Sequence, residues 1–214
     1  GDAYKIAGKY INGDVEVIFE VAINVIEAPE SSFVAPEADY VIDVNVVQDN
    51  GWGATHFALD GTDVTGWSAY DKADTYVNPV AGVSVDITAE IEAALGLEIG
   101  TLKDEINGGT VFVGAYNANN EFVDCFETAT SWYFFWFDKD GSIQGTNYAC
   151  IDNFGFRDGL IQMYGTTCVQ PNTAEIGTTY ATYIVFKTEE AEYVVQINQE
   201  VVAAPEKVPA PEME

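Results

Sequence analysis

The side chains that could carry out catalysis are few and widely separated. His56 is the only histidine among the 214 residues, and no Gly-x-Ser-x-Gly segment occurs in the chain. A Ser-His-Asp nucleophile needs a positioned base, so we interpret His56 as a structural or solvent-facing residue. Gly51-Trp52-Gly53 lacks the spacing of a phosphate-binding glycine motif. The sequence therefore assigns no catalytic residue.

Carboxylates are abundant, and their abundance does not identify a glycosidase site. Such a site needs two carboxylates roughly 5–10 Å apart, and among 35 acidic residues some pair will always meet that distance. Asp124, Glu127 and Asp138 have aromatic neighbours, but we interpret them as strand-end or turn residues. Residues 138–142 resemble the start of a calcium loop, yet the later Glu and following helix are absent. We predict a turn with Gly141 at positive φ, and no metal or cofactor is assigned.

The aromatic side chains give the clearest functional signal. Several lie in the Gly-, Asp- and Thr-rich segment 49–78, which we predict to form loops around one short strand. Tryptophan and tyrosine faces stack on the C–H faces of sugars, and neighbouring acids bond to sugar hydroxyls. We therefore predict a binding site for a neutral glycan built from Trp52, Trp67, Tyr70, Tyr76, Asp60 and Asp71.

Six consecutive aromatics, residues 132–137, form the most unusual stretch of the chain. Side chains alternate faces along a strand, so Trp132, Phe134 and Trp136 share one face. A half-exposed strand would alternate apolar with polar residues. The run is therefore either a strand buried on both sides or a strand with one face open to a ligand. We favour a central strand that holds the loops in place.

The composition excludes several classes of partner. Eight Lys and Arg against 35 Asp and Glu give a formal charge of −27, which cannot neutralise a row of nucleic-acid phosphates. The same charge disfavours anionic membranes and acidic polysaccharides. Of Cys125, Cys150 and Cys168 at least one stays unpaired, and buried free thiols are favoured over a disulfide. No run reaches the length of a membrane helix. No signal peptide is visible, and we interpret Gly1 as the start of a trimmed or mature chain from which an export signal has been removed.

Short strands separated by turn signals predict an all-β fold, a mainly antiparallel, jelly-roll-like β-sandwich. Residues 40–47 alternate, with Val41, Asp43 and Asn45 on one face. One or two short helices are predicted near 87–106. Asp86 or Thr88 caps the first helix and Gly96 ends it, and Thr101 caps the second.

An internal repeat defines the domain organisation. Residues 1–30 read as strand, Asn12-Gly13 turn and strand, and they align without gaps with residues 177–206, both segments ending in Ala-Pro-Glu. We therefore predict that 1–30 is a hairpin like the closing hairpin of a preceding module. An isolated hairpin is marginal in water, so it must pack on the main domain or find partners upstream. Residues 31–204 form the sandwich and 205–214 a disordered tail.

The order of features resembles an uncharacterised module, a domain of unknown function, in secreted and surface proteins of Bacteroides-type gut bacteria. The matching residues are Val85-Asp86-Ile87, Leu95-Gly96-Leu97, residues 111–120, the turn at 136–141 and Gly177–Tyr180. The resemblance covers about 83–202 and carries no catalytic residue. It implies an extracellular or outer-membrane location, in lipoproteins or beside glycoside hydrolases, with other surface proteins of glycan use as partners.

Three functions agree with these features. The first is a non-catalytic carbohydrate-binding module that captures neutral glycans through the loop aromatics. The second is a structural or adhesion-like spacer, which the terminal repeat favours because tandem modules commonly act as spacers. The third is a glycosidase-like enzyme, which lacks an identifiable acid pair.

Overall fold

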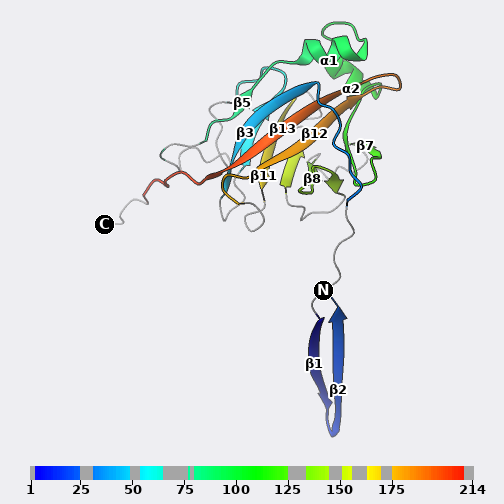
Figure 1. The fold of residues 1–214 in the computed structure, drawn as a ribbon, viewed down its shortest axis with the longest axis vertical. Coiled ribbons are helices and arrows are strands. Elements are labelled where there is room, and N and C mark those ends of the chain that lie inside the picture. Colours follow the sequence, from blue (N-terminus) through cyan, green and yellow to red (C-terminus); the bar gives the residue numbers. More distant parts are fainter. Residues whose placement is uncertain are drawn as a thin grey trace. The chain divides into compact units, whose positions relative to one another are not determined.

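The chain forms two compact units, Gly1–Ser31 (unit 1) and Ser32–Glu214 (unit 2) (Figure 1). The structure is a computed structural model that describes residues 3–24, 31–48, 54–64, 77, 80–124, 134–144, 151–155, 163–169 and 175–209. The division falls beside the boundary predicted after residue 30. The prediction that 1–30 packs on the main domain stays a prediction.

Unit 1 is a single antiparallel hairpin. Strands β1 (Ala3–Asn12) and β2 (Val15–Asn24) pair along their whole length, from Ala3↔Asn24 to Asn12↔Val15. Gly13 opens the two-residue turn with φ +60°, a conformation that glycine adopts at little cost. The turn predicted from Asn12-Gly13 is confirmed.

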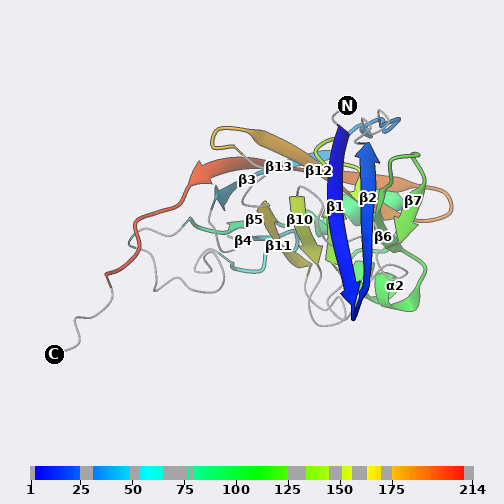
Figure 2. The ribbon, with the colours of Figure 1, turned by 90° about the horizontal axis from the view of Figure 1, so that it is seen from below.

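The described part of unit 2 contains two sheets that lie in two layers (Figure 2). One sheet has the order β3-β13-β12-β6-β7 and the other β5-β4-β11-β10-β8-β9. The strands are β3 (Tyr40–Gln48), β4 (Ala54–Ala58), β5 (Val83–Ser84), β6 (Phe112–Tyr116), β7 (Phe122–Asp124), β8 (Phe134–Phe137), β9 (Ile143–Gln144), β10 (Ile151–Gly155), β11 (Tyr164–Val169), β12 (Thr179–Lys187) and β13 (Glu192–Ala203). Most neighbours are antiparallel, whereas β3–β13 and β4–β5 are parallel. The predicted all-β, mainly antiparallel fold is confirmed.

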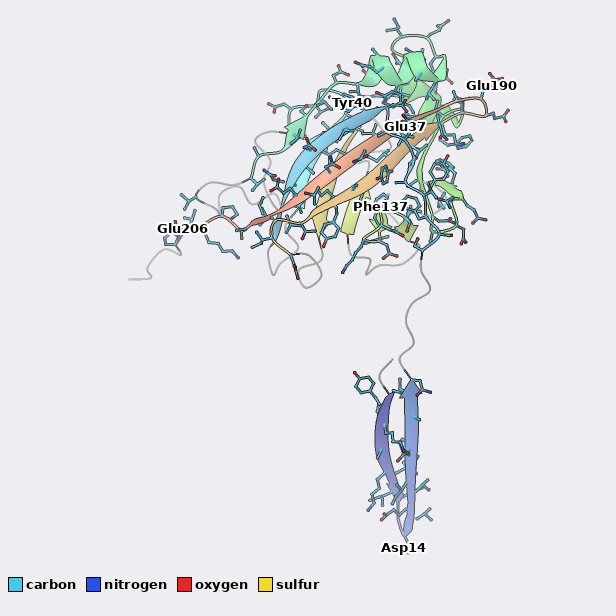
Figure 3. All side chains as sticks on the ribbon, in the orientation of Figure 1. Asp14, Glu37, Tyr40, Phe137, Glu190 and Glu206 are labelled. Carbon is cyan, nitrogen blue, oxygen red and sulfur yellow. The ribbon has the colours of Figure 1, made fainter. Side chains whose placement is uncertain are left out.

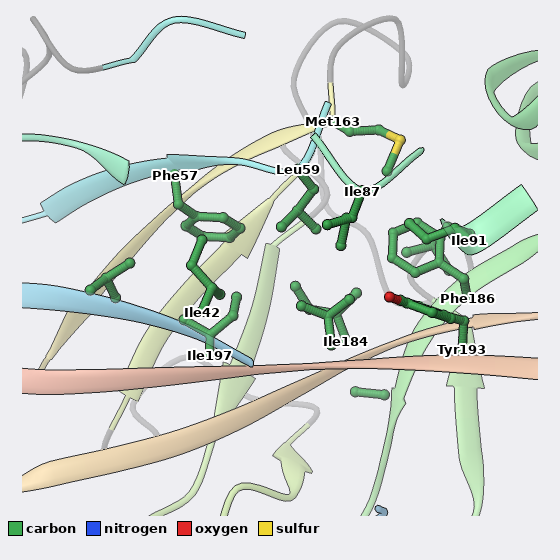
Figure 4. Packing of buried hydrophobic residues seen from close by; sticks show 14 of the residues in the cluster. Ile42, Phe57, Leu59, Ile87, Ile91, Met163, Ile184, Phe186, Tyr193 and Ile197 are labelled. Carbon is green, nitrogen blue, oxygen red and sulfur yellow. The ribbon is translucent and has the colours of Figure 1, made fainter. Parts of the chain in front are cut away.

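One hydrophobic core fills the space between the two sheets (Figure 4). Phe57 of β4 faces Ile184 and Ile197 of the other sheet, and all three are buried. Alternation along β3 sets its orientation, since Ile42, Val44 and Val46 are buried while Val41, Asp43 and Asn45 are exposed. The predicted shared face of those last three residues is confirmed.

Two short helices among the described residues close one end of the sandwich (Figure 1). Helices α1 (Thr88–Leu95) and α2 (Leu102–Gly108) add Ile91 and Ile106 to the core. Asp86 accepts hydrogen bonds from the Thr88 amide and hydroxyl, at 3.2 and 2.6 Å, beside the start of α1. Gly96 ends α1 with φ +71°, as predicted.

The start of α2 differs from the prediction, because the Thr101 side chain makes no capping hydrogen bond. Glu92 of α1 performs this role from a buried position, 3 % exposed. Its carboxylate accepts hydrogen bonds from the amides of Gly100 (2.9 Å) and Leu102 (3.0 Å). A carboxylate at a helix N-terminus accepts hydrogen bonds from the free backbone amides there and interacts favourably with the helix dipole. A tertiary contact therefore replaces the local threonine cap.

The aromatic run supplies β8, which lies between β10 and β9 in the six-stranded sheet. It is an interior strand, and Phe137 is 1 % exposed. Trp136 is half-buried, and residues 131–133 lie outside the described part of the chain. This position supports the interpretation of the run as a strand of the fold.

The segment predicted as a disordered tail, 205–214, is described as far as residue 209. There the Val77 amide donates a hydrogen bond to the Glu206 carbonyl at 2.8 Å. The start of the segment is thus joined to unit 2, and the prediction for 210–214 falls outside the described residues.

Candidate functional site

Most of the predicted glycan site lies outside the described residues, namely Trp52, Trp67, Tyr70, Asp71 and Tyr76. Glycan binding by these side chains stays a prediction. A glycan array with a Trp52→Ala, Trp67→Ala variant as control tests it. If no neutral glycan binds the unaltered chain, the prediction of a glycan site is wrong.

Asp60 is the predicted site residue that the structure describes, and it joins α2 to the six-stranded sheet. Its carboxylate forms an ion pair with Lys103 of α2 at 2.6 Å, and its side chain is 5 % exposed. The same carboxylate accepts hydrogen bonds from the Thr62 amide and hydroxyl, at 3.1 and 2.6 Å, and from the Met163 amide at 3.2 Å. These contacts give Asp60 a structural role.

Acid is expected to remove the stability that Asp60 contributes. Burial raises the pKa of this carboxyl, but hydrogen bonds from Lys103, Thr62 and Met163 outweigh it and hold the pKa at about 2, below the ordinary 3.8. Because the folded-state pKa is the lower one, the contribution is present above pH 3.8 and is lost as the pH falls through about 2. It amounts to about 2 kcal/mol.

Urea unfolding at two pH values measures this contribution. Asp60→Asn should lose about 2 kcal/mol of unfolding free energy near neutral pH, and its deficit should shrink as the pH approaches 2. Asp104→Asn, an exposed carboxylate of α2, is the control and should change little. A deficit of Asp60→Asn that does not depend on pH would contradict the assignment.

The other residues considered for chemistry occupy structural positions. His56 belongs to β4 and is 4 % exposed. Asp124 ends β7 half-buried, and Glu127 lies outside the described residues. Asp138 begins the turn after β8, where burial and the nearby Asp140 raise its pKa. Asp138 and Asp140 are thus close enough to influence each other, and both lie in the turn after β8.

The described part of the chain contains neither a candidate metal cluster nor a membrane-spanning helix. It holds no cluster of three or more His, Cys, Asp or Glu that could bind a metal. No helix in it is long and apolar enough to cross a bilayer. Cys168 lies in β11, whereas Cys125 and Cys150 lie outside the described residues, as does any pairing with them.

A polar cluster at the end of the β12–β13 hairpin joins three side chains. The Tyr116 hydroxyl donates to Glu192 at 2.6 Å, and the Lys187 ammonium donates to Glu192 at 2.8 Å. Hydrogen bonding to Glu192 raises the pKa of Lys187. Burial alone would raise the pKa of Glu192, but hydrogen bonds from Lys187 and Tyr116 leave it below its ordinary value. The cluster therefore ties β6 to the turn end of β12 and β13.

A parallel pairing joins the first described strand of unit 2 to its last. β3 and β13 pair without interruption from Tyr40↔Val195 to Gln48↔Ala203. We call this pairing the β3–β13 seam. Tyr40, where the chain enters β3, and Glu206, beyond β13, lie toward opposite ends of this pairing (Figure 3). The chain therefore enters and leaves the seam at opposite ends.

Side chains strengthen the β3–β13 seam along its length. Asn198 donates to Asp43, its directly paired residue on β3, at 2.8 Å, and Gln196 donates to Asn198 at 2.7 Å. Before Tyr40, Asp39 and Val194 exchange two hydrogen bonds, one from each amide, at 2.9 and 2.8 Å. The seam thus continues beyond the strand itself.

The segment that leads into β3 is held by the turn between β6 and β7. Asn120, at φ +61°, accepts a hydrogen bond from the Val34 amide at 2.8 Å and donates to the Ser32 carbonyl at 2.9 Å. The Ser32 hydroxyl donates to the Ala118 carbonyl at 2.8 Å. We call these contacts the Asn120 clamp. It anchors the incoming chain ahead of the seam.

The sequence pointed to some of these residues only indirectly. The sequence Asn117-Ala118-Asn119-Asn120 is typical of a turn, and asparagine is among the few residues that adopt positive φ readily. The partner of Asn120 lies 86 residues away, and the partner of Asn198 lies 155 residues away. Local patterns identify such residues as turn or strand residues, and their partners follow only from the fold.

Comparison with known protein families, curated proteins and solved structures found no match to this chain. The resemblance to a module of Bacteroides-type surface proteins therefore stays a prediction. The functional argument rests on the geometry of the chain itself.

Proposed function

We propose that this chain is a force-bearing structural module, an adhesion-like spacer of an extracellular or outer-surface protein. The observation that carries the proposal is the parallel β3–β13 seam. Force applied to the ends of the module pulls β3 and β13 in opposite directions along their axes. All backbone hydrogen bonds of the seam then bear load together, whereas unzipping would break them one after another.

Two further features support this role. The Asn198–Asp43 hydrogen bond crosses the seam on its exposed face, so side chains add to the backbone bonds that resist sliding. The Asn120 clamp holds the chain at Ser32, ahead of Tyr40. A net charge of −27 favours solubility outside the cell, which agrees with the extracellular or outer-surface location that we predict.

Single-molecule force spectroscopy on the full chain tests the proposal. Pulling from the two termini should unfold unit 2 in one high-force event after a smaller event from the Asn120 clamp. The main event releases roughly 540–590 Å of extended chain between Tyr40 and Ala203. The unfolding force depends on the height of the unfolding barrier along the pulling direction. Shearing the β3–β13 seam should therefore set the force of the main event.

The control changes only the direction of the force. An attachment point at Glu190, in the turn before β13, lies beyond the end of the seam at which Tyr40 pairs with Val195 (Figure 3). Pulling between the N-terminus and Glu190 should unzip β3 from β13 at a force several times lower. Equal forces in the two geometries would refute the force-bearing role.

A further inference from the structure

One face of the unit 1 hairpin is exposed and is apolar except for Asn12 beside the turn, although it has the pattern of a core face. The opposite face carries the ion pairs Lys5–Glu20 and Lys9–Glu16, each at 2.7 Å. The apolar face, which we call the Phe19 face, has large side chains that are 42–61 % exposed: Tyr4, Ile6, Tyr10, Val15, Val17, Phe19, Val21 and Ile23. So large an apolar face marks a contact surface.

The pairing of this hairpin repeats that of the β12–β13 hairpin. A constant offset of 176 carries Tyr4↔Ile23 onto Tyr180↔Gln199, and Ile11↔Glu16 onto Lys187↔Glu192. Every pair between these two also coincides. Register in a hairpin decides which side chains share a face. The two hairpins are therefore similar in sequence, and equivalent residues lie on the same face in both.

This equivalence identifies the Phe19 face as a core face. Tyr10, Phe19 and Val21 correspond to Phe186, Val195 and Ile197, which are at most 1 % exposed in unit 2. The ion-paired face corresponds to the opposite side of β12 and β13. In unit 2 the face of β12 and β13 that corresponds to the Phe19 face is buried against the second sheet and α1 (Figure 4).

A compensating pair at the centre of the face supports the same conclusion. Ile184 and Val195 pair in unit 2, and the equivalent residues of unit 1 are Gly8 and Phe19. The Phe19 ring lies over Gly8 so closely that a Cβ there would be 2.2 Å from it. One large and one absent side chain replace two of medium size. Volume-conserving exchanges of this kind preserve a packed interior.

The chain around the hairpins repeats as well. Ala-Pro-Glu follows each hairpin, at 28–30 and 204–206, and occurs a second time soon afterwards, at 35–37 and 210–212. Residue 31, which begins the chain leading into β3, thus has a counterpart after residue 206. This arrangement is typical of tandem modules joined in one polypeptide.

We infer that the Phe19 face completes the core of a β-sandwich of the same kind as unit 2, contributed by a module that precedes the hairpin in the polypeptide. The inference rests on the proposed function, since an array of spacer modules supplies this partner. In that module β2 would pair in parallel with a counterpart of β3, and β1 with a counterpart of β6, as β13 and β12 do here. A hairpin so placed would join successive modules.

The offset of 176 defines the experiment. Residues 31–176 are added ahead of Gly1 of the full chain, so that residues 1–30 take the place that 177–206 hold in unit 2. Hydrogen exchange is then followed at the β1 and β2 amides in the extended and the unaltered chain. In the unaltered chain they should exchange fast, because an isolated hairpin is marginal in water. In the extended chain they should exchange at least about 100-fold more slowly.

Two substitutions in the extended chain separate the two faces. Phe19→Lys on the Phe19 face should abolish the protection, whereas Ile11→Lys on the ion-paired face should preserve it, because Ile11 is 60 % exposed and corresponds to Lys187 of unit 2. Equal effects of both, or fast exchange in the extended chain, would overturn the inference. Protection in the unaltered chain would also overturn it. If that protection did not depend on protein concentration, unit 2 of the same chain would be the partner. If it increased with protein concentration, a second copy of the chain would be the partner. The β3–β13 force measurement does not involve this face, so either proposal can fail alone.

Discussion

Glu92→Ala is expected to lower the unfolding free energy of unit 2 by about 3 kcal/mol, since hydrogen bonds to a charged group contribute about 1.5–3 kcal/mol each. The Glu92 carboxylate is 3 % exposed and accepts hydrogen bonds from the Gly100 and Leu102 amides. Its removal leaves the start of α2 without a cap, because Thr101 makes none. The loss should appear in urea unfolding followed by circular dichroism.

Glu98→Ala is the matched control for this prediction. Glu98 lies between the helices but is exposed, and only its backbone carbonyl is used, by the Thr101 hydroxyl at 2.8 Å. This substitution should therefore change stability by less than about 0.5 kcal/mol. If both variants lose the same amount, the cap from Glu92 is not what holds α2.

Gly141→Ala is expected to destabilise unit 2 by about 3 kcal/mol or more, through backbone strain and a clash together. Gly141 has φ +89°, and a Cβ there would lie 2.6 Å from the Ala181 carbonyl oxygen and 2.8 Å from the Tyr183 ring. The turn after β8 therefore packs directly against β12. A backbone oxygen cannot move away cheaply, so the strands themselves must shift.

Gly177→Ala separates strain from clash. Gly177 has a similar φ of +86°, but a Cβ there would have nothing within 4 Å. Gly177→Ala should lower the unfolding free energy by about 1–2 kcal/mol, because alanine at this position must adopt the left-handed backbone conformation. Thermal unfolding of the two variants measures the difference, and equal losses would show that the contact with β12 contributes nothing.

The two proposals describe one assembly. Within a module the β3–β13 seam joins the incoming strand to the outgoing one. Between modules, the segment after each closing hairpin leads into the next first strand, where the Asn120 clamp holds it. Force would then pass from the seam of one module to the seam of the next through the connecting segment, which is held at both of its ends.

Strand and turn positions could be predicted from the sequence because they depend on near neighbours. Alternation along β3 placed Val41, Asp43 and Asn45 on one face, and the structure exposes all three. Gly96 and Gly141 were predicted as turn or stop residues, and both have positive φ. These features follow from the two-residue period of strands and the freedom of glycine.

The sequence by itself determined the fold class, the turn of the unit 1 hairpin and the repeat of residues 1–30 at 177–206. Only the tertiary structure decided what those elements contact. It paired β3 in parallel with a strand 155 residues away and gave α2 a cap from Glu92 in place of Thr101. Alternation specifies which face of a strand is buried but not which strand lies beside it. The choice of neighbour depends on packing the whole core, and in unit 2 it places the first described strand beside the last.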